Sequence, residues 1–178
     1  MKFTRYFTKD AGQFVWPEMR LVDVTITNVD GTLLFEQKDV EIPKAWSDMA
    51  ARILAQKYFW GKRGTSKREK SLKQVVNRIV PWYVAQGKKQ GYFSTDEDAQ
   101  IFEDELTYMI VYQYFAFNSP VWFNVGVDSK KQCMVSACYI NELQDSMESI
   151  FDLAKTEGLI FKDGSGSGVN LSNLRAKG

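Results

Sequence analysis

The stretch FNSPVWFNVGVDSKKQCMVSACYINE, residues 117–142, decides how this sequence of 178 residues is interpreted. It holds both cysteines of the chain, Cys133 and Cys138, and a Ser119-Pro120 step. Further along follows KDGSGSGVN (162–170), a glycine-rich segment. A serine before a proline, a cysteine in an apolar segment and a Gly/Ser loop are components of a nucleotide site with thiol chemistry. The residues before 117 are interpreted as scaffold.

Bulk composition predicts a folded chain and excludes several kinds of site. Hydrophobic residues make up 44% and aromatic residues 14% of the sequence, enough for the core of one domain, or of one domain and part of a second. The sequence contains no histidine, which excludes a Ser-His-Asp triad and a histidine-ligated metal within this chain. Its two cysteines, at 133 and 138, make a poor zinc site.

Charge and the first residues bear on the environment of the protein. Lys and Arg total 23 against 22 Asp and Glu, so bulk charge provides no attraction to nucleic acid or to a membrane surface. The start, MKFTRYFTKDAGQ, lacks the apolar segment of a signal peptide, and no run of about 18 apolar residues is present to span a membrane. Two cysteines in a chain of this size argue against a disulfide framework, and we predict a cytoplasmic protein.

The chain is predicted to begin with an irregular arm and a β-hairpin. Residues 1–19 are mixed and aromatic, and we expect them to pack on a neighbouring surface. In RLVDVTITN (20–28) apolar and polar residues alternate, which predicts a half-buried strand. Asp30-Gly31 is a turn signal, and residues 32–38 are predicted to return as the second strand.

Apolar residues at helical spacing predict three helices before residue 117, each with a start or stop signal. The helices are expected over residues 44–58, beginning at Pro43; over 69–80, kinked or interrupted at Pro81, resuming and then ended by Gly87; and over 95–116, capped by Ser94 and Glu97. Between the first two lies GKRGTSKREK (61–70), a basic loop that is either simply solvated or binds phosphate.

The rest of the chain is predicted to open a structure of the βα type. Asn118-Ser119-Pro120 is expected to be a turn at the end of the long helix, a rigid place for a polar side chain. Residues 134–140 are predicted to be a buried strand, and a helix capped by Asp145 or Ser146 follows over 146–160. A single buried strand needs partners, so we expect other strands to come from another chain, or the chain to have been cut.

Cys138 and the glycine-rich loop are the candidate chemical groups, and each has a plain structural alternative. Cys138 is either an inert core thiol or a reactive one. It is not expected to pair with Cys133, because residues five apart on an extended strand are separated by about 16 Å. The loop from Gly164 to Gly168 either offers N–H groups to an anion or is a plain surface loop. It matches neither a P-loop nor a dinucleotide fingerprint.

The order of the longer motifs is more specific. FNSPVWFNVG, VSACYI and DSMESIFDLAKTEGLIFKDGSGSGVNLSNLR resemble, in that order, the catalytic subunit of ribonucleotide reductase. The branch that they most resemble is class II, which depends on adenosylcobalamin. The earlier segments FEQKDVEIPKAWS, KYFWGKRGTSKREKSLKQVVNRIV and GYFSTDEDAQIFEDELTYMI are similar to the N-terminal helical region of that family. The resemblance extends from about Arg5 to Gly178.

This resemblance implies a fold of the α+β class in two parts. Residues 1–117 would form a mainly helical N-terminal domain with a β-hairpin. Residues 118–178 would form the first strand and helix of a ten-stranded α/β barrel, which is incomplete within this chain.

The resemblance also implies roles for individual residues. Cys138 matches one of the two cysteines that reduce the substrate, and Ser119 matches a substrate-contacting serine or threonine before a proline. Ala137 and Cys138 would contact the ribonucleotide, and the loop around Gly166 would let it lie against the backbone. A dithiol that closes to a disulfide supplies the two electrons needed to replace a ribose 2′-OH by hydrogen.

The family has further parts that this chain is expected to lack. The second reducing cysteine, a thiyl-radical cysteine, an acidic residue and most contacts to adenosylcobalamin lie further along the family's sequence. We therefore expect the chain to be inactive alone and to need a partner chain carrying the rest of the barrel. A thiol reductant such as thioredoxin and a dimer of the assembled enzyme fit the same picture, with no nucleic-acid or membrane partner.

Two other hypotheses stay open at this point. One is a non-catalytic binding or assembly module that retains the scaffold alone. The other is a self-contained α+β domain that binds a phosphate ligand at the Gly/Ser loop. A truncated gene or an expression fragment is the alternative to a natural split.

Overall fold

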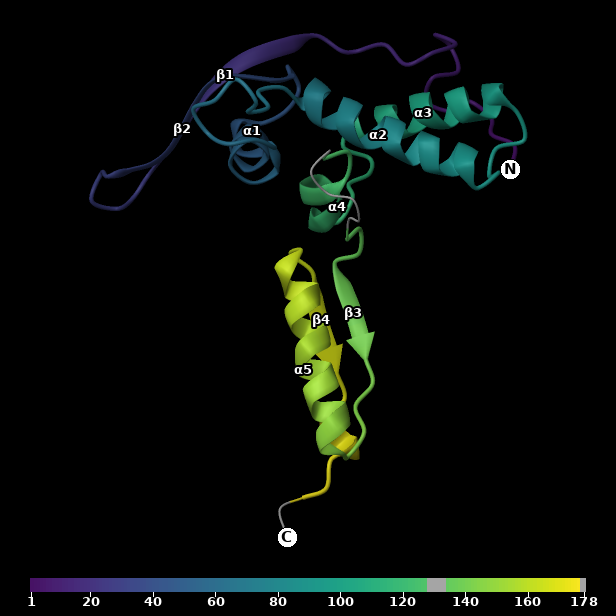
Figure 1. The fold of residues 1–178 in the computed structure, drawn as a ribbon. Coiled ribbons are helices and arrows are strands. Elements are labelled where there is room, and N and C mark those ends of the chain that lie inside the picture. Colours follow the sequence, from purple (N-terminus) through teal and green to yellow (C-terminus); the bar gives the residue numbers. More distant parts are fainter. Residues whose placement is uncertain (128–133, 177–178) are drawn as a thin grey trace. The chain divides into compact units, whose positions relative to one another are not determined.

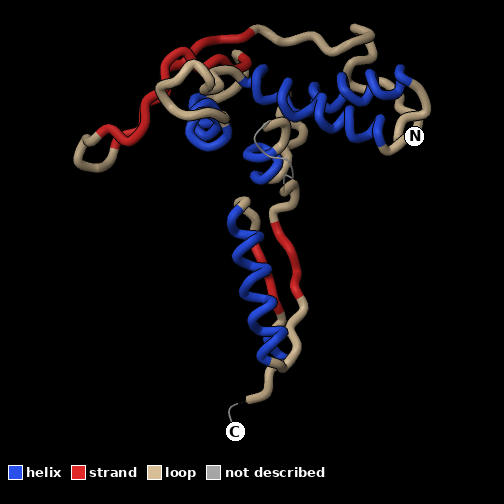
Figure 2. The backbone as a smooth tube through the Cα atoms, in the orientation of Figure 1, coloured by secondary structure: helices blue, strands red, loops and turns tan. Residues whose placement is uncertain are grey.

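The computed structural model describes residues 1–127 and 134–176. The chain divides into two compact units, Met1–Ala116 and Phe117–Gly178, which are described separately below. Figures 1 and 2 show the elements along the chain. In order they are β1 (Met19–Thr27), β2 (Leu33–Pro43), α1 (Asp48–Ile53), the π-helical turn η1 (Leu54–Tyr58), α2 (Leu72–Lys89), α3 (Asp96–Val111), α4 (Ser119–Asn124), β3 (Cys138–Asn141), α5 (Met147–Lys162), β4 (Gly166–Val169) and the 3₁₀ turn η2 (Leu171–Asn173).

The predicted hairpin is confirmed, with a longer second strand. β1 and β2 pair antiparallel, and the register shifts between Val22 and Val24. At the shift, the Asp23 carboxylate accepts a hydrogen bond of 3.0 Å from the backbone N–H of Asp39, which has a left-handed φ of 55°. Strand pairing continues as far as Pro43, so this proline ends β2 and does not start a helix.

The first helix therefore begins later than its proline suggested. Ser47 is its N-cap, and the Ser47 hydroxyl accepts from the N–H of Ala50 at 3.2 Å. A serine whose hydroxyl accepts a hydrogen bond from a backbone N–H in the first turn stabilises the start of a helix. Proline is only tolerated at that position, so it is a weaker start signal.

α2 continues through Pro81 and past Gly87, so an interruption at Pro81 and an end at Gly87, which we considered, are both wrong. It starts with a capping box, in which Ser71 accepts from the first turn and the Gln74 side chain accepts from the backbone N–H of Ser71 at 3.1 Å. Gly87 does not end the helix because it is a packing position. A Cβ there would lie 2.5 Å from the ring of Phe93.

α3 begins one residue later and ends earlier than predicted. Thr95 is the N-cap, and its hydroxyl accepts from the N–H of Asp98 at 3.0 Å. The helix ends at Val111, and Gln113 follows with a left-handed φ of 62°. As a result, Ser119 does not follow the long helix directly but is the first residue of the short helix α4, with Pro120 in its first turn.

The N-terminal arm packs on α3, as predicted for an irregular segment. The backbone N–H of Phe3 donates to Asp98 at 2.8 Å, and those of Phe7 and Thr8 both donate to Glu105 at 2.9 Å. The rings of Phe3, Phe93 and Phe102 meet beneath the arm, with centroids 5.4–5.8 Å apart. The core of this first unit includes fully buried residues of β2 and α2, namely Val40, Ile42, Leu72, Val75, Val76, Ile79 and Val80.

In the second unit β3 and β4 form a parallel pair, from Cys138 beside Gly166 to Asn141 beside Val169. α5 is the crossover between them, since parallel neighbours cannot be joined by a tight turn. Two predictions are corrected here. The strand begins at Cys138 and not at residue 134, and its partner comes from the glycine-rich segment, which was expected to be a loop. The expected cap of α5 is confirmed, because Ser146 accepts from the N–H of Ser149.

Across residues 1–127 and 134–176, none of the helices combines the length and the apolar character that a membrane span requires.

Candidate functional site

The two faces of the β3–β4 pair differ in what covers them. Asn141 donates to Ser167 on the neighbouring strand at 2.8 Å, and the Ser167 hydroxyl donates to Glu157 of α5 at 2.9 Å. This chain of polar contacts shows that the face of Asn141 and Ser167 is turned toward α5. Because side chains alternate along a strand, Cys138 and Ile140 lie on the opposite face.

The Cys138 thiol is exposed in this unit, and Ile140 is 94% exposed. We had predicted a buried strand, so this expectation was wrong for the described residues. The reason is that nothing within them covers the face that turns away from α5. An accessible cysteine is a candidate for redox chemistry, whereas a thiol enclosed by a core is inert. Cys133 lies outside the described residues.

Glycines keep the same face free beside the thiol. In the parallel register Gly166 is paired with Cys138, and Gly168 with Ile140. A Cβ on Gly166 would have the carbonyl oxygen of Ala137 as its nearest neighbour, at 3.5 Å, and one on Gly168 would lie 3.9 Å from the carbonyl of Tyr139. These are ordinary contacts, so the fold does not require glycine at either position. What the glycines provide is bare backbone next to the sulfur.

Three of the four residues proposed as substrate contacts are brought together. The N–H of Gly166 donates to the carbonyl of Ala137 at 2.6 Å, and Cys138 is the strand partner of Gly166. Ser119 lies on α4 in the same unit. The N–H of Gly166 is engaged within the sheet, so the glycine segment is not an open anion nest at this position.

Two buried polar residues that we did not predict hold this region together. Asn124, at the end of α4, donates to the carbonyls of Met134 at 2.9 Å and Asp163 at 3.2 Å. Ser165 donates from its hydroxyl to the carbonyl of Ser136 at 2.6 Å. Both tie the segment before β3 to the segment before β4. The signal in the sequence was weak: an asparagine that ends an apolar helix, and one serine among glycines.

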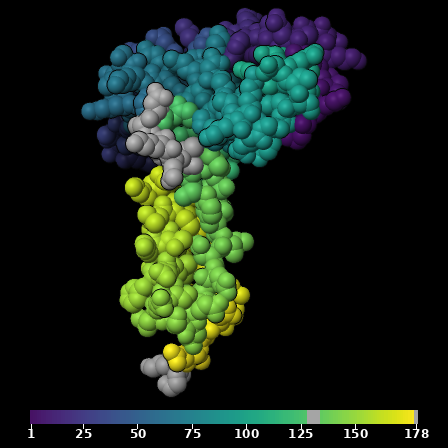
Figure 3. Space-filling view, turned by 45° about the vertical axis from the view of Figure 1, so that its right-hand side comes forward, coloured from purple at the N-terminus to yellow at the C-terminus, as the bar shows by residue number. Residues whose placement is uncertain are grey.

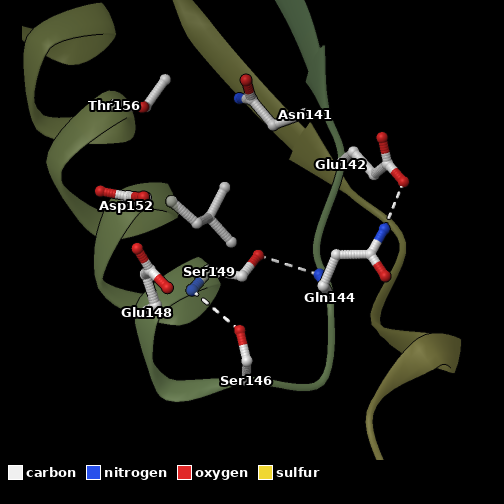
Figure 4. Close-up of a pocket in the computed structure, with 9 residues that line it drawn as sticks. Asn141, Glu142, Gln144, Ser146, Glu148, Ser149, Asp152 and Thr156 are labelled. Atoms are coloured by element: carbon white, nitrogen blue, oxygen red, sulfur yellow. Dashed lines mark hydrogen bonds between the residues drawn. The ribbon is translucent and has the colours of Figure 1, made fainter.

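A pocket of about 320 Å³ lies at the other end of β3, between the strand's exit and the first turns of α5 (Figure 4). The carboxyl ends of parallel strands are a common place for ligands. This pocket, however, is lined by three carboxylates, from Glu142, Glu148 and Asp152, which disfavour a phosphate. Its serines are already used locally, since Ser149 accepts from the N–H of Gln144 at 2.9 Å. We therefore place the candidate site at the Cys138 end.

A protein-bound metal ion finds no ligand set in the described part of the chain. No group of three or more Cys, His, Asp and Glu residues is arranged there to hold one. The reactive group that the structure does describe is the exposed Cys138 thiol, which lies beside the backbone of Gly166.

Comparison with known proteins places both units in one family. Residues 20–113 match the family model described as class II vitamin B12-dependent ribonucleotide reductase. Residues 136–178 match the model described as the barrel domain of ribonucleotide reductase.

Individual relatives agree with this assignment. A vitamin B12-dependent ribonucleotide reductase of Streptomyces coelicolor is 53% identical over 86% of this chain, which is 16% of the relative. One of Rhodopirellula baltica is 35% identical over 99% of the chain and 20% of the relative. A ribonucleoside-diphosphate reductase large subunit of African swine fever virus is 36% identical over 40% of the chain and 9% of the relative. The chain thus spans about a sixth to a fifth of the B12-dependent relatives. Since the first family model covers more than half of its residues, the chain belongs to the class II vitamin B12-dependent ribonucleotide reductases.

Proposed function

We propose that this chain supplies the N-terminal scaffold and the first strands of a ribonucleotide reductase barrel of ten strands, with Cys138 as one of two cysteines that reduce a ribonucleotide. The observation that carries the proposal is the face of the β3–β4 pair opposite α5. It combines an exposed thiol with two glycine positions and the backbone of Ala137. A ribose lying on this bare backbone would be in contact with the sulfur.

The chemistry follows from what a thiol pair can supply. Replacement of the 2′-OH breaks the C2′–O bond, and the oxygen leaves as water. Two electrons and two protons come from two thiols, which close to a disulfide. Cys138 supplies one thiol, and we assign the second, together with the thiyl-radical cysteine that starts the reaction, to barrel strands outside this chain. An external dithiol such as thioredoxin would reduce the disulfide again.

The missing strands would come from a partner chain. β3 and β4 form a sheet of two strands, and no further strand pairs with either of them in the described residues. An isolated pair of strands is marginally stable and leaves unpaired backbone groups at its edges. A partner that continues the sheet satisfies these groups and encloses the Cys138 face. A dimer of the assembled enzyme and a cytoplasmic location belong to the same proposal.

Adenosylcobalamin would supply the radical that starts the reaction. The described residues provide no metal-ligand set, and the sequence has no histidine to coordinate cobalt. These facts concern ligands to cobalt and not contacts to the corrin ring, and we propose that most contacts to the cofactor lie on the partner chain.

The test is to reconstitute the enzyme from its two chains and to compare the activities of variants at the two cysteines. The chain is mixed with a polypeptide carrying the remaining barrel, a ribonucleotide, a dithiol and adenosylcobalamin, and deoxyribonucleotide is measured. Cys138→Ser should abolish product while leaving co-sedimentation of the two chains intact. Cys133→Ser is the matched control and should retain turnover. Normal turnover in Cys138→Ser would sink the role proposed for this thiol and would favour a non-catalytic assembly module.

A second test concerns the bare backbone beside the sulfur. Gly166→Ala adds a methyl group on the Cys138 face without a clash, since its nearest neighbour would be 3.5 Å away. We expect unchanged thermal stability but a KM for the ribonucleotide raised about tenfold, because the substrate is displaced from the backbone. Gly168→Ala, two residue pairs further along the sheet from the thiol, should have a smaller effect. Equal effects of the two variants on KM would contradict the proposed position of the ribose.

A further inference from the structure

A closed loop in the first unit offers a rigid platform next to β2. The backbone N–H of Trp60 donates to the Glu69 carboxylate at 2.6 Å, and the N–H of Glu69 donates to the carbonyl of Trp60 at 2.9 Å. Inside the loop, the N–H of Thr65 donates to the carbonyl of Lys62 at 3.3 Å. A loop whose ends are joined in this way presents its side chains from a fixed backbone, and such loops are often functional.

The guanidinium of Arg68 fills the centre of this loop. It donates to the carbonyls of Ala55 at 2.5 Å and Gly61 at 3.1 Å, and also to that of Phe59. Its Nε donates to the Gln37 side chain at 3.2 Å, which fastens the loop to β2. Four hydrogen bonds therefore hold Arg68 in place, and its positive charge is met by neutral acceptors.

A cavity of about 390 Å³ lies between the loop and β2. Its volume is in the range of small-molecule sites. Four of its nine lining residues are basic, Lys38, Arg63, Arg68 and Lys70, and one, Glu36, is acidic. The hydroxyls of two further lining residues add polar groups. The cavity therefore carries a formal charge of about three positive units, by the usual ionisation states at neutral pH.

Acidic side chains offset this charge only in part: Glu36 lines the cavity, and the charge of Glu69 raises the pKa of Arg68. Glu69, the acid of the loop itself, is paired with Arg78 at 2.8 Å, and both side chains are buried. In the part of the chain that the structure describes, no ion pair involves Lys38, Arg63 or Lys70.

Two of the cations, Arg63 and Arg68, are close enough for their charges to interact. The guanidinium of Arg63, an exposed residue, lies over the ring of Phe35, 4.5 Å from its centroid, a cation–π contact that favours this position. Burial, and then the nearby charge of Arg63, lower the pKa of Arg68. Like charges gathered by the fold around a cavity repel one another, and a bound anion relieves that repulsion.

We propose that this cavity binds the phosphate chain of a small polyphosphate anion. Several separate cations fit a ligand with several charged groups better than a single carboxylate, and a guanidinium and lysines are the usual partners of phosphate. The site lies in the first unit and involves none of the residues proposed for ribonucleotide reduction.

The test uses the 178-residue chain alone, with sodium tripolyphosphate and ATP as probes in isothermal titration calorimetry at about 0.15 M salt. We expect saturable binding of both, with similar affinities, because the phosphate chain is what is recognised. Lys38→Ala/Lys70→Ala should weaken binding about tenfold or more, since two charged contacts are lost. Lys62→Ala/Lys67→Ala is the matched control. It removes the same charge from the same region, at exposed side chains outside the cavity lining, and should change the affinity about twofold at most.

Three outcomes would overturn the proposal. They are the absence of saturable tripolyphosphate binding, equal losses in the two double variants, and tighter binding of a single-stranded oligonucleotide than of tripolyphosphate. Both double variants should keep the melting temperature of the parent chain, because all four lysine side chains are exposed. The result is separable from ribonucleotide reduction, since the titration needs neither Cys138 nor a partner chain.

Discussion

At the scale of single residues, two glycines inside helices have opposite surroundings. Gly87 of α2 is buried, and a Cβ there would lie 2.5 Å from the Phe93 ring. Gly158 of α5 is exposed, and a Cβ there would meet no atom within 4 Å. The first glycine is required by packing, whereas the second only weakens its helix.

Alanine substitutions at these positions should therefore have opposite effects. Gly87→Ala forces the Phe93 ring to move, which costs about 1–3 kcal/mol and outweighs the gain of about 1 kcal/mol in helix propensity. Gly158→Ala should stabilise by up to about 1 kcal/mol, since only the propensity changes. Urea unfolding followed by circular dichroism measures both. Stabilisation by Gly87→Ala would show that Phe93 yields at little cost.

At the scale of elements, the sequence predicts those with strong periodic patterns well and their ends less well. The alternation in β1 and the apolar spacing of α2 correctly predicted that a strand and a helix form there. The ends of helices depend on which nearby side chain makes the capping hydrogen bond. The N-cap of α1 is therefore Ser47, although Pro43 was the expected start, and the N-cap of α3 is Thr95 and not Ser94.

β4 and the face of Cys138 could not be predicted in the same way. Gly and Ser have low strand propensity, and Gly166–Val169 is a strand because it pairs with β3. The apolar character of the segment around Cys138 predicted that it is buried. In the described chain no element covers the face of Cys138 and Ile140. The alternation of side chains along a strand predicts that two faces exist, but not which of them is covered. The roles of Ser119, Ala137, Cys138 and Gly166 in catalysis remain predictions.

Docking of the N-terminal arm on α3 should depend on pH. The N–H of Phe3 and the Thr95 hydroxyl donate to Asp98 and hold its pKa below the usual range. Burial raises the pKa of Glu105, but hydrogen bonds from Thr8 and Phe7 outweigh it and the net shift is downward. Groups with depressed folded-state pKa values stabilise above their unfolded-state pKa, and the contribution is lost as the pH falls through the folded value.

We therefore expect the arm to stay docked at neutral pH and to detach below about pH 4. The amide resonances of Phe3 and Thr8 in a ¹⁵N NMR titration report this directly. In Asp98→Asn the Phe3 amide should lose its pH dependence while that of Thr8 keeps it. Detachment of the parent arm at or above pH 6 would contradict this assignment.

At the scale of the whole molecule, the two units differ in how completely they bury their apolar residues. The first encloses the core of β2 and α2 described above. The second leaves large side chains of α5 open, among them Met147, Phe151, Leu159 and Phe161, each more than half exposed. Figure 3 shows part of α5 as yellow-green surface atoms. An apolar surface of this kind marks an interaction site or an aggregation risk.

The chain alone should therefore bind a dye that fluoresces on apolar surfaces, and the proposed partner chain, if it covers α5, should suppress the signal. Phe151→Ser/Leu159→Ser should reduce the dye signal about twofold and weaken the complex. Leu33→Ser/Leu34→Ser is the control, since both leucines are exposed at the hairpin of the first unit. It should leave the complex intact. If both double variants weaken the complex equally, α5 is not the partner's surface.

The paired glycines beside Cys138 have a consequence for how this protein can change. Where a strand presents only hydrogen atoms, any substitution adds bulk, and none can widen the approach further. The room next to the sulfur is therefore already at its upper limit at these two positions. Variation there can act in one direction alone, toward less space beside the thiol.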